Sequence, residues 1–472
     1  MPSQCAAKYA GCVTDVQSRT DVVSLLSAEL GNVVSTDPLE LDAARADKSG
    51  HVASGTPLAI VHAETIEHVQ AAMRIATATR TAVVTRGAGT GLAGASNAGA
   101  GEIVLSTLRM TRIIEVNEED EIAVVEPGIL NADLNAVLAH KGLWWAPDPA
   151  SRAIATVGGN IATNAGGLLC VKYGVTREAV LGLKVVLADG RLIRLGHRTV
   201  KGVTGLDFTA LMIGSEGLLG VIVEATLRLR RLDLSPFSTI GAYFSSVEEA
   251  ARAAAVISSS GLRPAIMEVI DKPAMIAIAA HLGLSVREES YLLVQTDGPG
   301  AALEAESALG IIRSLGGDAE LSTNPEEGAR LLHVRRSFHP AMQTLGTVLI
   351  EDVCVPRSAM PAMFAAIEKI SAKYGIAIPT VAHAGDGNMH PNFVFTPDPT
   401  QEGGVPAIVW DAADELFLAA MRLGGTLTGE HGIGLLKKRW LISELGEDQF
   451  DLQQQVKAVF DPLGILNPGK VF

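Results

Sequence analysis

Apolar and polar positions form short blocks along the chain, and the spacing within these blocks predicts a mixture of strands and helices. Residues 1–55 are polar and predicted to be helical, with one apolar stretch at 22–30. After Pro57 the run LAIVHA predicts a strand, and the spacing within TIEHVQAAMRIATATR predicts a helix with Thr65 as its cap. A second strand, AVVT, follows directly. The first regular unit is therefore strand–helix–strand.

The next part of the chain is predicted to contain more strands than helices. IVLS and EIAVVEP predict two strands, followed by a helix with Asn131 as its cap and Gly142 after its end. Residues 181–195 predict a hairpin, because an Asp-Gly turn at 189–190 separates two apolar runs. LLGVIVEATLRLRR predicts a last strand. Since strands and helices do not alternate strictly, we expect an α+β domain.

The pattern restarts near Leu234. STIGAYF predicts a strand, and the capping-box pattern at Ser246 and Glu249 predicts the start of a helix that leads to the strand PAIMEVI. The strand SYLLVQTDG, a helix over 301–315 and the strand DAELST repeat this order. Two such units in tandem predict a ferredoxin-like α/β sheet, which would form a separate, cap-like domain.

Composition and charge narrow the classes of function. Apolar residues make up 48% of the 472 positions, so the chain can bury substantial cores in two or three domains. The formal charge of −14 argues against nucleic acid or anionic lipid as the main partner, because both bind basic surfaces. No run reaches the roughly 18 to 20 apolar residues of a membrane-spanning helix, and the N-terminus has no signal-peptide run. We therefore expect a soluble, cytoplasmic protein.

The cysteine pattern excludes some redox centres. Cys5, Cys12, Cys170 and Cys354 are scattered and form no C-x-x-C pair. They match neither an iron–sulfur nor a zinc-ribbon pattern, and the chain has no haem C-x-x-C-H. We expect free thiols in a reducing compartment.

Three glycine-rich loops carry the first functional signal. RGAGTGLAG at 86–94 follows a predicted strand, and its small residues let backbone N–H groups converge on a phosphate. Its surroundings do not match a nicotinamide-binding Rossmann fingerprint. Residues 147–167 show little helix or strand pattern and almost no charge, so a bound group should order them. GSEGLLGVI at 214–222 is a third glycine-rich segment. Each loop alone could be a turn, but together they predict a site for an extended dinucleotide.

Two histidine-bearing segments near the C-terminus predict a metal site. In TVAHAGDGNMHPNFVF two apolar runs flank a turn, and His383 and His390 lie close together if the runs pair as a hairpin. GGTLTGEHGIG adds Glu430 and His431, of which one can bind a metal while the other faces a substrate. Two histidines and a carboxylate suit a divalent metal, although each histidine alone is explained as well by a structural or surface role.

With these segments in this order, the chain resembles the FAD-linked D-2-hydroxy-acid dehydrogenase branch of the vanillyl-alcohol-oxidase/p-cresol-methylhydroxylase flavoprotein superfamily. Glycolate oxidase FAD subunits and D-lactate dehydrogenases belong to that branch. The resemblance implies non-covalent FAD, because the 86–94 loop lacks the histidine to which some relatives attach FAD. The FAD contacts that it implies are Arg86, Gly87, Gly89, Thr90, Gly91, Leu92, Pro147, Thr156, Gly159, Asn160, Thr163, Asn164, Glu216, Gly220, Ile222 and Asn467.

The patterns H-x-G-D-G-N-x-H and G-E-H-G-I-G are signatures of this branch. They imply that His383, His390 and Glu430 hold a divalent metal (zinc, manganese or iron) and that His431 is the catalytic base. By the same resemblance Asn388 supports the site or contacts the substrate.

Arg335 resembles the arginine that clamps the substrate carboxylate, a task that suits a bidentate guanidinium. Leu332 stands where relatives often have tryptophan, so Arg336 could be the functional arginine instead. Ile350 stands where hydroxyglutarate enzymes carry lysine, which favours small acids. Ala88 replaces a glycine of many relatives and affects only the fine geometry of its loop.

The implied fold is α+β, with a two-subdomain FAD-binding domain of the p-cresol-methylhydroxylase type and a ferredoxin-like α/β cap. Asn467 and Lys470 are expected to lie where the C-terminal segment returns to the flavin domain, and Asp352 could be only structural. The expected boundaries are 1–53 for an N-terminal helical segment, 54–233 for the FAD-binding domain, 234–425 for the cap with the metal-site loop, and 426–472 for the C-terminal segment.

The expected reaction is oxidation of a small D-2-hydroxy acid to the 2-keto acid. His431 removes the hydroxyl proton with the help of the metal, and the α-hydrogen leaves as hydride to the flavin. The electrons must then pass to a separate acceptor: an electron-transfer flavoprotein, an iron–sulfur subunit, a quinone or a cytochrome. Through that acceptor the protein could lie at the periphery of a membrane, and the sequence leaves a homodimer open.

Three alternatives stay open at this point. The same fold could act on another alcohol or on a larger acid such as D-2-hydroxyglutarate. A metal-dependent hydrolase could use the two histidines and Glu430 with a bound water, the glycine loops being structural. A non-enzymatic nucleotide-binding subunit is the third, although such a subunit has no use for His431 beside a metal.

Overall fold

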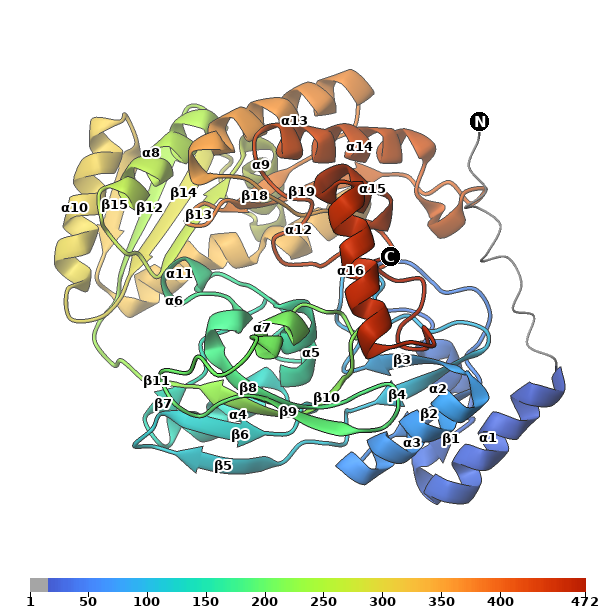
Figure 1. The fold of residues 1–472 in the computed structure, drawn as a ribbon. Coiled ribbons are helices and arrows are strands. Elements are labelled where there is room, and N and C mark those ends of the chain that lie inside the picture. The colour runs from blue at the N-terminus through green and yellow to red at the C-terminus, as the bar shows by residue number, and fades with distance from the viewer. Residues whose placement is uncertain (1–15) are drawn as a thin grey trace.

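The chain folds into two lobes, each built on its own β-sheets (Figure 1). The computed structural model describes residues 16–472, and the predictions made for residues 1–15, including the free thiols Cys5 and Cys12, lie outside the described residues. The lobe in blue to green holds a four-stranded and a five-stranded sheet, and the lobe in yellow-green to orange holds an eight-stranded sheet. The C-terminal helices, in red, pack against the hydrophobic cores of both lobes.

The first sheet has the strand order β1-β2-β4-β3, with β2, β3 and β4 parallel. The predicted strand–helix–strand unit is confirmed: the side chain of Thr65 caps α3 by accepting from the backbone N–H of His68. The elements of this region are α1 (Val16–Leu30), η1 (Gly31–Val33), β1 (Val34–Ser35), α2 (Pro38–Ala43), β2 (Ala59–His62), α3 (Ile66–Thr79), β3 (Ala82–Arg86) and β4 (Glu102–Ser106).

The second sheet is antiparallel, with the order β5-β6-β10-β8-β9. The predicted hairpin is its β8–β9 pair, and Gly190 in the turn has a φ of 83°, which suits glycine. The elements are β5 (Ile113–Asn117), β6 (Ile122–Val125), α4 (Asn131–Ala139), β7 (Leu143–Trp144), α5 (Val157–Thr163), α6 (Cys170–Tyr173), η2 (Thr176–Ala179), β8 (Val180–Val186), β9 (Leu192–Gly196), α7 (Phe208–Met212), β10 (Val221–Arg228) and β11 (Arg230–Arg231).

Two predictions for this lobe are wrong. The glycine-rich segment 147–167, expected to lack regular structure, contains the helix α5, which Thr156 caps by accepting from the N–H of Gly159. Asn131 is not the cap of α4 but its first residue, and its side chain donates to Pro147 and Asn160 instead. The sequence did not predict α5 because its small residues give no periodic pattern of bulky apolar positions.

The eight-stranded sheet begins with the predicted ferredoxin-like order, β15-β12-β14-β13, and continues through β18, β19 and β16, with β17 paired to β19. The elements are β12 (Ser238–Phe244), α8 (Val247–Ser259), β13 (Ile266–Ile270), α9 (Lys272–Leu282), β14 (Ser290–Thr296), α10 (Ala301–Ser314), β15 (Asp318–Ser322), α11 (Pro325–Arg336), α12 (Phe338–Leu345), β16 (Thr347–Ile350), β17 (Val353–Cys354), η3 (Arg357–Ala359), α13 (Met360–Tyr374), β18 (Thr380–His383), β19 (Asn388–Phe395), η4 (Glu402–Gly404) and α14 (Ala407–Arg422).

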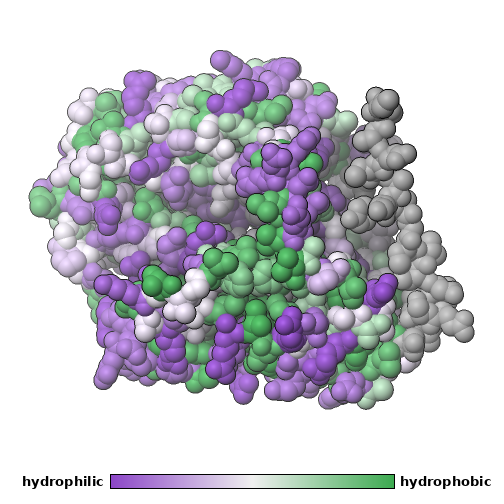
Figure 2. All heavy atoms as spheres, in the orientation of Figure 1, coloured by the Kyte–Doolittle hydropathy of each residue, from purple (hydrophilic) through white to green (hydrophobic). Residues whose placement is uncertain are grey.

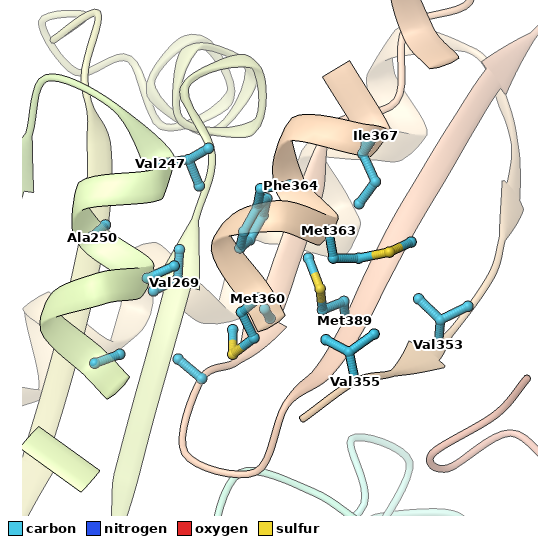
Figure 3. Close-up of a cluster of buried hydrophobic side chains, with 14 of the residues drawn as sticks. Val247, Ala250, Val269, Val353, Val355, Met360, Met363, Phe364, Ile367 and Met389 are labelled. Atoms are coloured by element: carbon cyan, nitrogen blue, oxygen red, sulfur yellow. The ribbon is translucent and has the colours of Figure 1, made fainter. Parts of the chain in front are cut away.

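The two faces of this sheet differ in character, and this difference positions the site. Val269 of β13 and Met389 of β19 pack with Phe364 of α13 in one apolar core (Figure 3). Since side chains alternate along a strand, the neighbours of these residues point to the opposite face. There β13 and β18 place Glu268 and His383 directly opposite each other in the strand register.

The last segment returns to the lobe with the four- and five-stranded sheets, called here the N-terminal lobe. After α15 (Lys438–Leu445) and α16 (Glu447–Phe460), the backbone N–H of Asn467 donates to the carbonyl of Val83 in β3, and Lys470 pairs with Glu102 at 3.0 Å. An apolar area near the middle of the face in Figure 2 coincides with the position of α7 in Figure 1. Among the described helices, none combines the length and the apolar character needed to cross a membrane.

Candidate active site

A cavity of about 1080 Å³ lies between the two lobes. Glycine-rich loops of the N-terminal lobe form one part of its wall, and the polar face of β18 and β19 forms another. The predicted cofactor residues that line this cavity are Gly87, Gly89, Thr90, Gly91, Leu92, Thr156, Gly159, Asn160, Thr163, Glu216, Gly220 and Ile222. The three glycine loops, distant in sequence, therefore meet around one cavity, as the sequence predicts.

At Gly87 the first glycine loop packs so tightly that a side chain would not fit. A Cβ on Gly87 would lie 2.5 Å from the side-chain oxygen of Thr156. Beside this loop, the hydroxyl of Thr85 and one carboxylate oxygen of Asp47 are buried, line the cavity and have no hydrogen-bond partner among the described residues. A cavity with buried polar atoms that lack partners is suited to a polar ligand.

Four predicted cofactor residues lie behind the cavity wall and brace it. The guanidinium of Arg86 donates to the carbonyls of Ala46 and Ser96. Asn164, with a φ of 52°, ends α5, and its side chain accepts from Arg177. The other two are Pro147 and Asn467. The carbonyl of Pro147 accepts from Asn131, and the side-chain amide of Asn467 donates to the carbonyls of Ala95 and Glu216.

Glu216 joins the third glycine loop to the loop that carries His431. Its buried carboxylate accepts from the backbone N–H groups of Ile433 at 2.8 Å and Gly434 at 2.9 Å. Burial raises the pKa of Glu216 to about 7. The loop that carries Glu430 and His431 is thereby fixed to the third glycine loop of the N-terminal lobe.

The predicted metal ligands converge on one point of the cavity wall. Nε2 of His383 lies 3.5 Å from one carboxylate oxygen of Glu430, and Nε2 of His390 lies 3.6 Å from the other. One ligand atom from each residue lies within 4.8 Å of those of the other two. The predicted β18–β19 hairpin produces this arrangement, because the two histidines come from adjacent strands and the same face of the sheet.

The charges around these three residues suit a cation. Burial opposes protonation of His383, but Glu268 and Glu430 outweigh it and raise the pKa of His383 well above its usual range. Burial likewise opposes ionisation of Glu430, but His383 outweighs it and lowers the pKa of Glu430 to about 2. Burial and His383 lower the pKa of His390 to about 3. The cluster thus favours one positive charge, which a divalent ion can supply in place of a proton.

His431 lies next to the ligand cluster and faces the same cavity. Its ring stacks on that of His390, with a centroid distance of 5.3 Å and an interplanar angle of 21°. Its Nδ1 lies 3.6 Å from a carboxylate oxygen of Asp352. Burial lowers the pKa of His431 below its usual range, so the imidazole is neutral and can accept a proton. Adjacent Glu430 and His431 thus reach the same cavity from one loop.

Asp352 has a larger part in this site than the sequence suggested. Its buried carboxylate accepts from the backbone N–H groups of Gly429 at 2.8 Å and Glu430 at 2.7 Å, and it pairs with buried Lys437. Burial opposes its ionisation, but His431 and Lys437 outweigh it and hold the pKa of Asp352 below its usual range. A permanent negative charge therefore lies behind the His431 ring.

The two candidate arginines differ in their surroundings. Nε of Arg335 donates to a carboxylate oxygen of Glu268 at 2.6 Å, whereas Arg336 makes no hydrogen bond or ion pair with the described residues. Both side chains line the cavity. Asn388 does not belong to the described cavity wall; its amide lies 3.5 Å from Nε2 of His390 and supports that ring from the side.

Several residues of the cavity escaped the sequence analysis. A buried carboxylate, Asp148, has its pKa raised to about 7 by burial, and Arg152 lies 4.0 Å from it. Asp47 and Asn392 also line the wall. The signal that could have found Asn392 is the alternation of polar and apolar residues in NMHPNF, which places it on the same face as His390.

Comparisons with known proteins identify the family to which the chain belongs. A family model described as "FAD linked oxidases, C-terminal domain" matches residues 235–471, and one described as "FAD binding domain" matches residues 57–196. The chain is 38% identical to glycolate oxidase subunit GlcD of Bacillus subtilis over 88% of this chain and 89% of that protein. It is 35% identical to D-lactate dehydrogenase of Archaeoglobus fulgidus over 87% and 90%, respectively.

Solved structures of other proteins have the same fold. The structure of p-cresol methylhydroxylase with substrate bound superposes with a TM-score of 0.78 at 18% identity, covering 97% of each chain. Fold, cavity and family models together define an FAD-binding oxidoreductase. Within that class, the chain belongs to the FAD-linked oxidase family, in the branch that contains GlcD and FAD-linked D-lactate dehydrogenases.

Proposed function

We propose that the protein oxidises a small D-2-hydroxy acid, of the glycolate or D-lactate type, to the corresponding 2-keto acid, with FAD as the hydride acceptor. The observation that carries this proposal is the convergence of His383, His390, Glu430 and His431 on a cavity that the glycine-rich loops also line. The names of the glycolate oxidase and D-lactate dehydrogenase relatives point to the same class of substrate.

FAD is proposed to lie along the glycine loops. The fit rests on the tight contact between Gly87 and Thr156 and on the hydroxyl of Thr85, which has no partner among the described residues. The cavity volume of about 1080 Å³ exceeds that of most sites for small molecules, which leaves room for a dinucleotide and a small acid. Binding is non-covalent in this proposal, because the 86–94 loop has no histidine.

A divalent ion, zinc, manganese or iron(II), is proposed to bind His383, His390 and Glu430. Imidazole and carboxylate donors suit these metals, and three protein ligands leave a position open for a substrate. When bound, the ion acts as a Lewis acid that lowers the pKa of the substrate hydroxyl, and FAD accepts the hydride.

The residues of the chain divide the remaining tasks. Nδ1 of His431 faces Asp352, which leaves Nε2 to take the hydroxyl proton. Asp352 stabilises the imidazolium that results, because its charge lies behind the ring. Arg335 binds the carboxylate of the acid and turns the α-hydrogen toward the flavin. Ile350 lines the cavity with an apolar side chain, so it offers no partner for a second carboxylate.

The electrons are proposed to leave for a separate acceptor: an electron-transfer flavoprotein, an iron–sulfur subunit, a quinone or a cytochrome. The two described cysteines, Cys170 and Cys354, are free thiols and do not suffice for an iron–sulfur cluster, which takes four. The glycolate oxidase relative is itself named a subunit, which favours a protein partner.

Anaerobic reduction of the flavin tests this function without knowledge of the acceptor. The visible spectrum of the purified protein is recorded while glycolate, D-lactate or L-lactate is added with oxygen excluded. Bleaching by glycolate or D-lactate, but not by the matched control L-lactate, is the expected result. Yellow protein that none of the acids bleaches would remove this substrate class. Colourless protein that takes up no FAD would contradict the whole proposal and favour the hydrolase alternative.

A further inference from the structure

Glu268 is a charged residue in a strand that otherwise contains only apolar residues. Every residue of β13 is buried, and Glu268 has no exposed surface. An isolated buried carboxylate is costly, so it should have strong partners. The strand register places it directly opposite His383 of β18, and both side chains lie on the polar face of the sheet.

The two carboxylate oxygens of Glu268 serve different residues. Oε1 lies 2.7 Å from Nδ1 of His383, and Oε2 accepts from Nε of Arg335 at 2.6 Å. The side chain of His383 is 7% exposed and that of Arg335 is 14% exposed, so all three groups are shielded from water. One carboxylate thus joins a candidate metal ligand to a candidate substrate-binding arginine.

The contact with His383 determines which ring nitrogen can bind a metal. An ionised carboxylate only accepts hydrogen bonds, so Nδ1 of His383 carries the proton that it donates to Glu268. Nε2 is then unprotonated in the neutral ring, and this is the nitrogen that lies 3.5 Å from Glu430. Carboxylates that hold metal-binding histidines in this way commonly fix both the tautomer and the orientation of the ring.

The contact with Arg335 fixes the direction of the guanidinium. Glu268 occupies Nε, while neither terminal amino group of Arg335 has a hydrogen-bond partner among the described residues. Because the side chain lines the cavity, these two groups are free to bind a carboxylate with two parallel hydrogen bonds. Without Glu268, the long side chain would have no polar contact to hold it.

We propose that Glu268 is a positioning residue that holds the metal ligand His383 and the carboxylate-binding Arg335 in one fixed geometry. This inference rests on the proposed function, since it takes the roles of both partners from it. It adds that metal binding and substrate binding depend on a single buried group that touches neither ligand. A substitution of Glu268 should therefore weaken both, whereas a substitution of either partner should act mainly on its own ligand.

The test uses FAD-loaded protein from which metal has been removed by a chelator. Zn²⁺ is titrated in competition with a zinc-binding dye, and the Kd of glycolate is taken from the saturation of anaerobic flavin reduction after zinc is restored. In Glu268→Gln the Kd of Zn²⁺ should rise about 10- to 100-fold. The Kd of glycolate should rise about tenfold, because the arginine loses its fixed direction.

Asp271 provides the matched control. It lies three residues after Glu268, is buried, and accepts from the backbone N–H groups of Ala274 and Thr380 without contact to the candidate site. Asp271→Asn should lower the thermal midpoint and leave both dissociation constants unchanged. Arg335→Met should raise the Kd of glycolate and leave that of Zn²⁺ near the wild-type value, so only the Glu268 variant should change both.

The outcomes separate this inference from the proposed function. If the wild-type protein binds zinc and Glu268→Gln retains both wild-type constants, Glu268 has no positioning role. If the wild-type protein binds no zinc, the proposed metal site fails, and this inference fails with it. Should Glu268→Gln not fold, Glu268→Asp keeps the charge but shortens its reach; both constants should rise by a smaller factor, and unchanged constants would again overturn the inference.

Discussion

Nδ1 of His431 lies 3.6 Å from Oδ1 of Asp352, a carboxylate with no exposed surface. Asp352 also accepts from the backbone of the loop that carries His431, so it fixes that loop while its charge lies beside the ring. Lys437 supplies the compensating charge, and it pairs with the same carboxylate oxygen that His431 approaches. A histidine beside a buried negative charge can take up a proton with that charge already in place, which is the property that a catalytic base needs.

The first prediction concerns this pair. Asp352→Asn keeps the shape of the side chain but removes the charge that stabilises protonated His431. The rate constant of anaerobic flavin reduction should fall on the order of 100-fold or more, while FAD and metal content stay at wild-type levels. Stopped-flow absorbance of the flavin measures this rate.

The control for this variant is Glu351→Gln. Glu351 is also buried and lies 3.4 Å from Lys437, but it has no contact with His431. This variant should lower the thermal midpoint and keep the rate within about threefold of the wild-type value. Equal rates in Asp352→Asn and the wild type would show that the carboxylate only supports the loop.

The sequence predicted the parts of the site that local patterns encode. The AGDGN turn between two apolar runs predicted the hairpin that brings His383 and His390 together, and helix caps such as Thr65 were readable from residue type. Burial and long-range pairing were not readable. Glu268 is separated from His383 by 115 positions, and their contact depends on the order of strands in the sheet.

The sequence analysis missed the role of Asp352, the helix α5 and the role of Glu268, each for a different reason. For Asp352 the sequence left a purely structural role open, because its partner, the His431 loop, is distant in sequence. The helix α5 was missed because its glycines and small polar residues obscure helical periodicity. For Glu268 a signal existed: a single acidic residue in the apolar run PAIMEVI must find a partner when the strand is buried.

The second prediction concerns the metal. Prolonged treatment with a chelator should abolish flavin reduction by D-lactate, and addition of zinc, manganese or iron(II) should restore it. His383→Ala removes a ligand, so it should lose metal and at least about 100-fold of the rate together. Metal content is measured by elemental analysis beside the rate.

His281, in the last turn of α9, provides the control for this experiment. It has no part in the described ligand cluster, so His281→Ala should retain metal and rate. A chelator-treated protein that is metal-free and still bleaches at the wild-type rate would refute the metal-assisted step.

The third prediction distinguishes the two arginines. Glu268 holds Arg335 with its terminal amino groups free, whereas Arg336 has no such support. Arg335→Met should therefore raise the KM for the acid about 10- to 100-fold, the expected loss of charged hydrogen bonds to a carboxylate. Arg336→Met should change KM less than about threefold. The opposite order would assign the carboxylate to Arg336 instead, and steady-state kinetics with an artificial electron acceptor decide between them.

The fourth prediction concerns the proposed cradle for FAD. Gly87→Ala places a Cβ 2.5 Å from the side-chain oxygen of Thr156, so the first glycine loop or the cap of α5 must move. Either movement disturbs the backbone groups proposed to bind the pyrophosphate, and the Kd of FAD should rise at least about tenfold. Quenching of FAD fluorescence during titration of apoprotein measures it.

Gly310, within α10, is the matched position for the same substitution. A Cβ there meets no atom within 4 Å, and alanine is the better helix former, so Gly310→Ala should raise stability by about 0.5–1 kcal/mol and leave the Kd of FAD unchanged. Comparison of the two variants separates the effect of an added methyl group on FAD binding from its effect on the stability of the protein. If Gly87→Ala bound FAD as tightly as Gly310→Ala does, the pyrophosphate would have to lie elsewhere in the cavity, and the loop at 214–222 would be the next place to test.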